Sequence, residues 1–268
     1  MYPYEKQYDQ VLKVEKEGPI AIITFDCQEK SNCITEQQID EFGAALDNVH
    51  WDKEVRVVIL RGIGPISFGY GDMELIQRKL AGNLPEGREL MTEIANVIKK
   101  MYTISKPIIG LAEGRCIGGG CNLILSSDAV IASEKASFWQ VFVNYALTPD
   151  TGGMWALQRL VGPMKAKMIA MCGEELDAQT AYEMGMVYKV AAADKAYDEA
   201  YALASKIAAK SPLGVNHIKQ ISNRLHEYSM DTYFQFEGDY ITLGALSGDY
   251  KETLTAMAQQ RAPKYKGY

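Results

Sequence analysis

The sequence predicts an α/β protein that ends in a helical section, and three observations lead to this prediction. Strand-like apolar runs alternate with helical patterns over most of the chain, and after Asp194 the pattern becomes almost wholly helical. With 47% hydrophobic and 23% charged residues, the composition is that of a globular protein. A chain of 268 residues is in the range that α/β proteins often fill as one folding unit, so we expect one main core.

A hairpin and a helix are predicted at the start of the chain. Residues 11–15 alternate apolar and polar side chains, residues 17–19 read Glu-Gly-Pro as in a turn, and residues 20–25 form a mostly apolar run. Thr35 and Gln38 then form a capping-box pair, and the apolar residues after them recur at helical spacing. A helix is therefore expected to follow the hairpin.

The middle of the chain continues the alternation of strands and helices. Strands are expected at residues 55–60, 107–112 and 129–132, and a segment with glycine and serine at 62–72 leads into the next helical stretch. One face of a helix carries Leu90, Ile94, Val97, Ile98 and Met101. Because parallel neighbouring strands need a long connection, this alternation predicts parallel sheets.

The C-terminal part is predicted to consist of helices. Ala200, Ala204 and Ile207 fall on one helical face, and a further helical run covers residues 214–228. We therefore divide the chain into a core at residues 1–205 and a helical C-terminal section at residues 206–268.

Charge and hydropathy exclude two classes of partner. Lys and Arg number 28 against 34 Asp and Glu, which gives a net charge of -6, so the phosphate attraction that drives nucleic-acid binding is missing overall. Apolar stretches such as residues 19–25 are far shorter than the ~20 residues that cross a bilayer. The first ten residues have neither the apolar stretch of a secretory signal nor the arginine bias of a transit peptide. We expect a cytoplasmic protein with no nucleic-acid or membrane partner.

Cysteine and histidine spacing predicts neither a disulfide framework nor a metal site. The cysteines are odd in number and include no Cys-x-x-Cys pair; they are Cys27, Cys33, Cys116, Cys121 and Cys172. The histidines are isolated from cysteine or carboxylate clusters; they are His50, His217 and His226. We therefore expect reduced thiols, structural or surface histidines and no bound metal.

Three consecutive glycines, Gly118 to Gly120, lie between a predicted strand and a predicted helix. Glycines let a ligand approach the main chain closely, and the first N–H groups of a helix have no partner within it. The arrangement therefore favours developing negative charge. It matches neither the Rossmann nor the Walker pattern, and a glycine-rich packing turn is an equally good interpretation of the run taken alone.

Four segments together resemble the crotonase superfamily of enoyl-CoA hydratases and isomerases. They are KPIIGLAEGRCIGGGCNLILSSDAVIASE, RGIGPISFGYGDM, LTPDTGGMWALQRLVG and DYKETLTAMAQQRAPKYKG. The resemblance runs over nearly the whole chain and implies a crotonase-type spiral of ββα units with a helical C-terminal section that makes trimers, often paired into hexamers. It also implies an acyl-CoA substrate, with coenzyme A as part of the substrate and no separate cofactor, and an oxyanion hole built from two backbone N–H groups.

The resemblance assigns the two N–H donors by position. The middle glycine, Gly119, supplies one, and a gapless match of the earlier loop makes Gly71 the other, with Tyr70 as the alternative. This loop departs from the family pattern, because Tyr70 lies where a glycine is expected and Ser67 where a phenylalanine is expected.

The catalytic carboxylates depart from the family pattern further. Family hydratases carry two glutamates where this sequence has Asn122 and Phe142, and an amide cannot act as a general base. Asp150, in the string PDTGGMW, lies where members similar to ring-epoxide phenylacetyl-CoA isomerase carry a working aspartate. We predict a catalytic role for Asp150, while a structural role as an N-cap of the following helix stays open.

Other side chains are candidates for binding the substrate. Gln140, Asn144 and Tyr145 lie between the last predicted strand and Asp150, with ordinary polar surface as the alternative. Phe138, Trp139, Phe142 and Met154 add apolar bulk, which suits an apolar or cyclic acyl group or serves as core packing. The predicted binding set is Tyr70, Asn122, Gln140, Phe142, Tyr145 and Lys264, with Lys264 and Arg261 near the CoA of a neighbouring subunit.

These residues favour an acyl-CoA isomerase. Gly71 and Gly119 would stabilise a thioester enolate, and Asp150 would take a proton from one carbon and return it to another. A single carboxylate suffices for that shuttle, whereas hydration usually needs a second group to hold water. Two alternatives stay open: a hydratase or hydrolase of an unsaturated, cyclic or aromatic acyl-CoA, and an acyl-CoA-binding member without catalysis.

Overall fold

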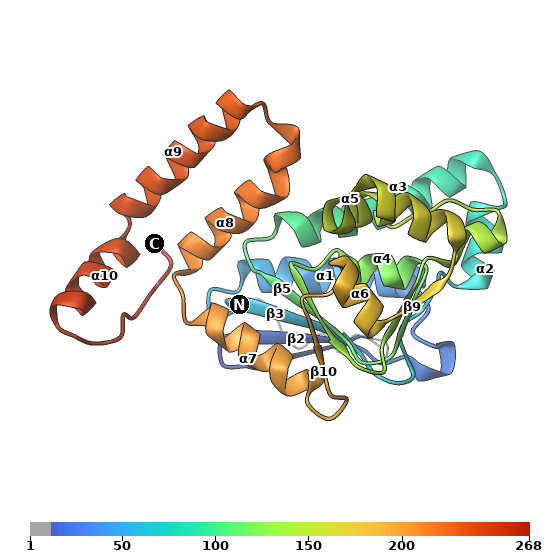
Figure 1. Cartoon of the computed structure of the whole chain (residues 1–268), viewed down its shortest axis with the longest axis horizontal. Coiled ribbons are helices and arrows are strands. Elements are labelled where there is room, and N and C mark those ends of the chain that lie inside the picture. The colour runs from blue at the N-terminus through green and yellow to red at the C-terminus, as the bar shows by residue number, and fades with distance from the viewer. Residues whose placement is uncertain (1–11) are drawn as a thin grey trace.

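Two β-sheets form the centre of the molecule, and a helical arm extends from it (Figure 1). The computed structural model describes residues 12–268. The larger sheet has the order β1 (Leu12–Glu17), β2 (Ile20–Phe25), β3 (Val57–Gly62), β5 (Ile108–Ala112), β7 (Ala129–Ser133), β10 (Lys189–Ala191). The smaller sheet has the order β4 (Ile66–Phe68), β6 (Arg115–Ile117), β8 (Ser137–Trp139), β9 (Glu175–Asp177).

The pairing of the strands confirms the predicted hairpin and the predicted parallel sheets. β1 and β2 are antiparallel across the turn at Gly18, which has a φ of 57°. From β2 to β10, the neighbouring strands of the larger sheet are parallel. In the smaller sheet only β8 and β9 are antiparallel. Val11, the first residue of the predicted hairpin, lies outside the described residues.

Helices cover both faces of the larger sheet. The body contains α1 (Glu36–Trp51), α2 (Met73–Leu75), the π-helical turn η2 (Ile76–Leu80), α3 (Leu84–Thr103), α4 (Gly119–Leu125), α5 (Gly153–Cys172), α6 (Ala178–Met184) and α7 (Ala196–Ala208). Short 3-10 turns occur at η1 (Gln28–Lys30), η3 (Val141–Tyr145) and η4 (Leu225–Glu227). The predicted capping box is confirmed at α1, where Thr35 Oγ1 accepts from the Gln38 N–H and Gln38 Oε1 accepts from the Thr35 N–H.

Side chains that alternate along the central strands pack into two different hydrophobic cores. Ala21 and Ile23 belong to the main core, whereas Ile20 and Ile22 belong to a second cluster with the alanine face of α7. Figure 1 shows α7 on one side of the larger sheet and α3, α4 and α5 on the other. A strand that is buried on both faces reads as a continuous apolar run, which is why residues 20–25 show no alternation.

The arm consists of α8 (Pro212–Arg224), α9 (Met230–Leu246) and α10 (Gly248–Ala258). The predicted boundary after residue 205 falls inside α7, which packs on the body as far as Ala208. The arm instead begins at Ser211, whose side chain caps α8 by accepting from the Gly214 N–H. Helical periodicity could not show this, because α7 and α8 share it; the available signal was the pair Ser211 and Pro212, a helix N-cap followed by proline at the first helical position.

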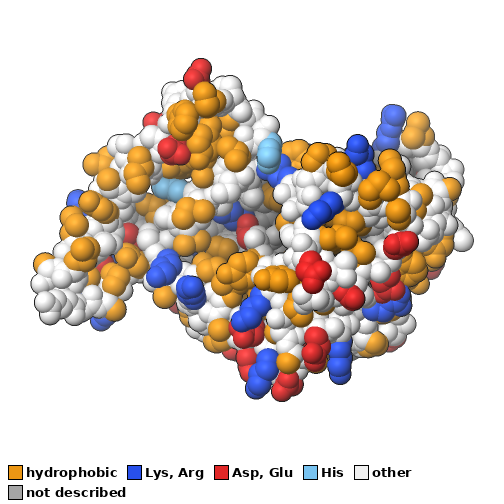
Figure 2. All heavy atoms as spheres, in the orientation of Figure 1, with side chains coloured by type: hydrophobic (Ala, Val, Ile, Leu, Met, Phe, Trp, Pro, Cys, Tyr) orange, Lys and Arg blue, Asp and Glu red, His pale blue; other side chains and the backbone are white. Residues whose placement is uncertain are grey.

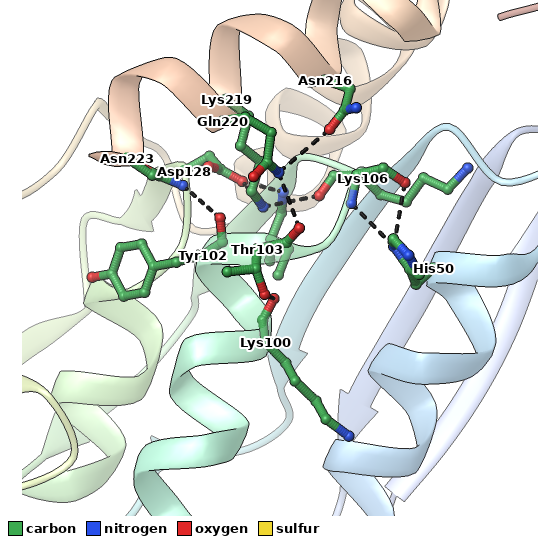
Figure 3. A network of polar contacts seen from close by, with 12 residues as sticks. His50, Lys100, Tyr102, Thr103, Lys106, Asp128, Asn216, Lys219, Gln220 and Asn223 are labelled. Carbon is green, nitrogen blue, oxygen red and sulfur yellow. Dashed lines mark hydrogen bonds and ion pairs between the residues drawn. The ribbon is translucent and has the colours of Figure 1, made fainter. Parts of the chain in front are cut away.

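A polar network fixes α8 to the body (Figure 3). Lys219 Nζ lies 2.8 Å from Asp128 Oδ2 and donates to the Lys106 carbonyl at 3.0 Å. Asp128 Oδ2 also accepts the Ile108 N–H at 2.7 Å. Burial lowers the pKa of Lys219, and the Asp128 carboxylate opposes that shift. A buried ammonium that is both paired and hydrogen-bonded holds the arm at one position on the body.

The rest of the arm leaves many apolar side chains exposed. Figure 2 shows orange apolar side chains along the whole arm. On α9 the large exposed ones include Met230, Phe234, Ile241, Leu243 and Leu246. None of the helices in residues 12–268 is long and apolar enough to cross a membrane.

Candidate active site

A cavity of about 600 Å³ lies beside the three glycines. Gly118 and Gly119 line it from the start of α4, and Asp150 and Thr151 line it from the segment before α5. Its apolar wall comes from α2, η2 and α3 through Met73, Leu75, Ile76, Leu80, Leu90 and Met91. The cavity therefore joins a polar end to an apolar interior, which is the arrangement of a small-molecule site.

The backbone around Gly119 is held by hydrogen bonds on both sides. Gly118, with a φ of 56°, donates its N–H to the Trp139 carbonyl at 2.9 Å, and Gly120 donates to the Gly69 carbonyl at 3.0 Å. A Cβ at residue 120 would lie 2.3 Å from that same carbonyl oxygen, so only glycine fits there. The Gly119 N–H between them donates to no backbone carbonyl of the described residues. It is free to bind a ligand oxygen.

The second predicted donor lies on the loop after β4. Ile34 donates its N–H to the Tyr70 carbonyl and accepts the Asp72 N–H, both at 2.9 Å. Because successive residues of an extended chain point their backbone groups to opposite sides, the Gly71 N–H points away from the Ile34 backbone. Gly71 lines the cavity, and Tyr70 lies beside it. The geometry favours Gly71 over Tyr70 as the donor, and the assignment stays a prediction.

Asp150 places its carboxylate next to Gly119. A methyl group built on Gly119 would lie 3.6 Å from Asp150 Oδ1 and 3.1 Å from Thr151 Oγ1. Burial raises the pKa of the Asp150 carboxyl, and the hydrogen bond from the Thr151 hydroxyl, 2.8 Å long, opposes that rise. Among the described residues that line the cavity, Asp150 is the one carboxylate. A raised pKa makes a carboxylate a stronger base, as a proton shuttle requires.

The alternative role of Asp150 as a helix cap is wrong. Helix α5 begins at Gly153, its N-cap residue is Gly152, and no side chain caps it. The Asp150 carboxylate accepts instead from the Thr151 hydroxyl.

The turn after Asp150 is strained. Thr151 has a φ of 48° and Gly152 a φ of 72°, so two successive residues adopt the left-handed conformation. This conformation is unfavourable for a β-branched residue such as threonine and costs on the order of 1–3 kcal/mol. The surrounding packing must hold the turn in place.

The structure brings some of the predicted binding residues to the cavity and not others. Tyr70, Phe142 and Tyr145 line it. Asn122 and Gln140 do not, because both side chains are buried behind it with exposed fractions of 0% and 1%. Their role as substrate-binding residues therefore has no support in the geometry.

Lys264 lies outside this cavity, and the predicted apolar residues divide between the cavity wall and the core. Lys264 does not line this cavity, and its backbone N–H donates to Glu252 Oε1 at 2.7 Å. Its predicted contact with the CoA of a neighbouring subunit stays a prediction. Trp139 joins Phe142 at the cavity, whereas Phe138 is buried in the main core.

Sequence reasoning missed Arg115 and Thr151 as cavity residues. Arg115 Nε and Nη2 each lie 2.8 Å from a Glu175 oxygen, and the guanidinium lies 5.5 Å from the centre of the Trp139 ring. The position of Arg115 in a strand beside the glycine run was the available signal. Thr151 gave none, because its role depends on a positive φ that its residue type disfavours.

No group of three or more metal-ligating side chains occurs in the described part of the chain. Its cysteines are free thiols, of which Cys172 is exposed and the other four are buried.

Comparison with known proteins decides the family. The profile of the enoyl-CoA hydratase/isomerase family matches residues 15–268. The chain belongs to this family. The crystal structure of an enoyl-CoA hydratase from Bacillus anthracis shares the crotonase fold at a TM-score of 0.90 and 27% identity, covering 97% of this chain and 100% of that one.

Relatives in this family include both hydratases and isomerases. A short-chain-enoyl-CoA hydratase of Clostridium acetobutylicum is 31% identical over 95% of this chain and 96% of its own length. The 1,2-epoxyphenylacetyl-CoA isomerase of Escherichia coli is 29% identical over 94% of this chain and 96% of its own length. Similarity therefore identifies an enzyme family without separating the two reactions.

Proposed function

We propose that the protein is an acyl-CoA isomerase in which Asp150 moves a proton between two carbons of the acyl group. The observation that carries the proposal is the Asp150 carboxylate beside Gly119, at the polar end of a mostly apolar cavity. The Gly71 and Gly119 N–H groups would bind the thioester oxygen and stabilise the enolate that forms when the proton leaves. One such donor typically contributes about 10²–10³ in rate.

The proton balance needs one carboxylate only. Ionised Asp150 accepts a proton from the carbon next to the thioester and becomes a carboxylic acid. The carboxylic acid then gives a proton to a different carbon of the delocalised enolate, so that the product has the composition of the substrate. Where the acid exchanges with solvent before this step, the proton that it gives comes from water. The buried environment that raises the pKa of Asp150 favours the first step, because it makes the carboxylate a stronger base. The second step proceeds because the carbon of the enolate is a stronger base than the carboxylate.

The cavity also supports an apolar acyl group. Leu75, Ile76, Leu90 and Met91 form the interior wall, and Phe142 lies where family hydratases carry a glutamate. A phenyl ring cannot hold a water molecule for addition to a double bond, so the wall supports isomerisation over hydration. An apolar chain or ring would bury its surface there.

Hydration is the second candidate, because a relative at 31% identity is a short-chain-enoyl-CoA hydratase. In that reaction Asp150 would activate a water molecule instead of the acyl carbon. A panel of acyl-CoA thioesters followed by mass spectrometry separates the two reactions. Isomerisation leaves the product mass unchanged in ordinary water and incorporates deuterium from heavy water, whereas hydration adds one water.

We also propose that the arm joins subunits into a homotrimer or a dimer of trimers. Support comes from α9, which contributes no buried residue within the single chain although its large apolar side chains are numerous. Burial against another subunit would remove that apolar surface from water.

A further inference from the structure

Asn122 and Gln140 form a buried pair of amides that ends on the backbone of Asp150. Gln140 Nε2 donates to Asn122 Oδ1 at 2.7 Å, and Asn122 Nδ2 donates to the Asp150 main-chain carbonyl at 2.9 Å. Both side chains are almost fully buried, and neither lines the cavity. The pair therefore acts on the chain at Asp150 and has no direct contact with a substrate.

Asn122 connects the two halves of the site. It lies on α4, the helix that begins at Gly119, and its own N–H donates to the Gly118 carbonyl at 3.0 Å. Its side chain reaches across to the Asp150 segment. A single side chain thus spans from the helix that carries one oxyanion donor to the residue that carries the base.

Close packing leaves Asn122 little freedom. A Cβ at residue 153 would lie 2.3 Å from Asn122 Nδ2, so the first turn of α5 lies directly against this amide. Gln140 occupies the acceptor end of the amide. With its oxygen and nitrogen both engaged, the Asn122 side chain has one orientation that satisfies it.

The Asp150 carbonyl is held at a strained turn. It accepts from the Asn122 amide and also from the Gly153 N–H at 2.7 Å. The next residue, Thr151, is left-handed and uses that conformation to bring its hydroxyl to the Asp150 carboxylate. Loss of the Asn122 bond would let this peptide rotate and the carboxylate move away from Gly119.

A carboxylate at position 122 could not replace the amide. The Asp150 carbonyl needs a hydrogen-bond donor, and an ionised carboxylate is an acceptor only. Its charge would also oppose ionisation of the Asp150 carboxyl. The amide therefore suits a site in which the base has moved from residue 122 to residue 150.

We propose that Asn122, oriented by Gln140, is a positioning residue that fixes the Asp150 carboxylate relative to the Gly119 N–H. This inference rests on the proposed function, in which Asp150 is the proton shuttle. A misplacement of about 1 Å at a reacting group can cost about 10²-fold in rate, so the effect on turnover is measurable.

The first test is Asn122→Ala with steady-state kinetics on an accepted acyl-CoA. We expect kcat to fall at least ~10-fold while KM changes less than ~3-fold, because the substrate does not touch Asn122. The acid limb of kcat/KM should move to lower pH, since a displaced carboxylate is better solvated and its pKa falls. A folded variant with the wild-type kcat and the wild-type limb would overturn the proposal.

Asn223→Ala is the matched control. Asn223 Nδ2 also donates to a main-chain carbonyl, that of Tyr102, at 2.9 Å, but it lies on the arm. This variant should keep kcat and the pH limb. An equal loss in both variants would show that Asn122 contributes only general stability, which contradicts the proposal.

Asn122→Asp keeps the test decisive if the alanine variant does not fold, because it preserves the shape of the side chain. When protonated, the new carboxyl can donate to the Asp150 carbonyl, and when ionised it cannot. We expect its activity relative to wild type to rise as the pH is lowered. A ratio that does not change with pH would overturn the proposal.

Asp150→Asn, measured alongside, separates the two levels of inference. If Asp150→Asn is inactive and Asn122→Ala has wild-type kinetics, only the positioning role fails. If Asp150→Asn retains wild-type turnover, the proposed function fails and the positioning role with it.

Discussion

The site around Asp150 and the arm of α8 to α10 differ in how their side chains are accommodated within one chain. At the site, the buried amide of Asn122 finds its partners within the chain, in Gln140 and in the Asp150 backbone. On the arm, Ile241 and Leu246 are 72% and 70% exposed, whereas α8 is bound to the body through Lys219 and Asp128. The contacts that position Asp150 are thus made within one chain, whereas the apolar side chains of the arm are not buried within it.

Because of this difference, we expect substitutions at the site and substitutions on α9 to have different effects. Changes at the site should alter turnover and leave the assembly intact, and changes on α9 should alter the assembly first. Each prediction below tests what we expect of the site or of the arm.

The largest effect is expected from Gly119→Pro. Proline removes the N–H that we assign to the thioester oxygen, and turnover should fall by at least about 10²–10³. Proline is tolerated at the first position of a helix, which residue 119 is in α4. A Cβ there would nevertheless lie 3.1 Å from Thr151 Oγ1, so folding is measured before the rate. Circular dichroism and sedimentation check folding and assembly, and steady-state kinetics checks the rate. Wild-type turnover in a folded variant would remove Gly119 from the site.

The next effect concerns assembly and uses Ile241→Asp on α9. Burial of an isoleucine side chain contributes about 1.5–3 kcal/mol, so a charge there should weaken subunit association by at least ~10-fold per contact. Sedimentation velocity at micromolar concentration measures it. The control is Gln179→Asp on α6 of the body, which should leave the assembly unchanged. A wild-type protein that is a stable monomer would refute the role of the arm.

The attachment of α8 is tested by Lys219→Met. This change leaves Asp128 partly buried without its cation, and loss of one partner from a buried pair costs about 3 kcal/mol of unfolding free energy. Denaturant unfolding measures the loss. Addition of Asp128→Asn should recover part of it, because the unpaired charge is then removed. Stability equal to wild type would show that the network in Figure 3 does not hold the arm.

How much of this could be predicted from the sequence depends on how local each feature is. The capping box of Thr35 and Gln38 was predictable, because its residues are neighbours in the chain. The bond from Asn122 to the Asp150 carbonyl was not, since folding alone brings these residues together. Asn122 was therefore predicted as a binding residue from its position in a motif, and the structure shows a buried side chain instead.

The cavity could not be predicted from the sequence, for a second reason. Leu90 and Ile94 lie on one helical stripe with Ile98 and Met101, yet only the first two line the cavity. Apolar periodicity shows which face of a helix turns inward. It does not show whether that face meets packed side chains or a space for a ligand.

A smaller effect is expected from Thr151→Val. The Thr151 hydroxyl stabilises the ionised carboxyl of Asp150, so its loss should raise the pKa of Asp150 further. The base works when ionised, and the acid limb of kcat/KM should therefore move to higher pH. Thr151→Ser keeps the donor and should keep the limb. An unmoved limb in Thr151→Val would show that this hydrogen bond does not tune Asp150.

The central claim is that Asp150 carries the proton, and Asp150→Asn tests it most directly. The variant keeps the size of the side chain and should melt at or above the wild-type temperature, because it removes a carboxylate whose burial disfavours its charged form. The measurement is deuterium exchange from heavy water into a bound acyl-CoA. We predict that exchange and turnover fall at least about 10²-fold while acyl-CoA binding is retained. Wild-type exchange in a folded Asp150→Asn protein would contradict the account.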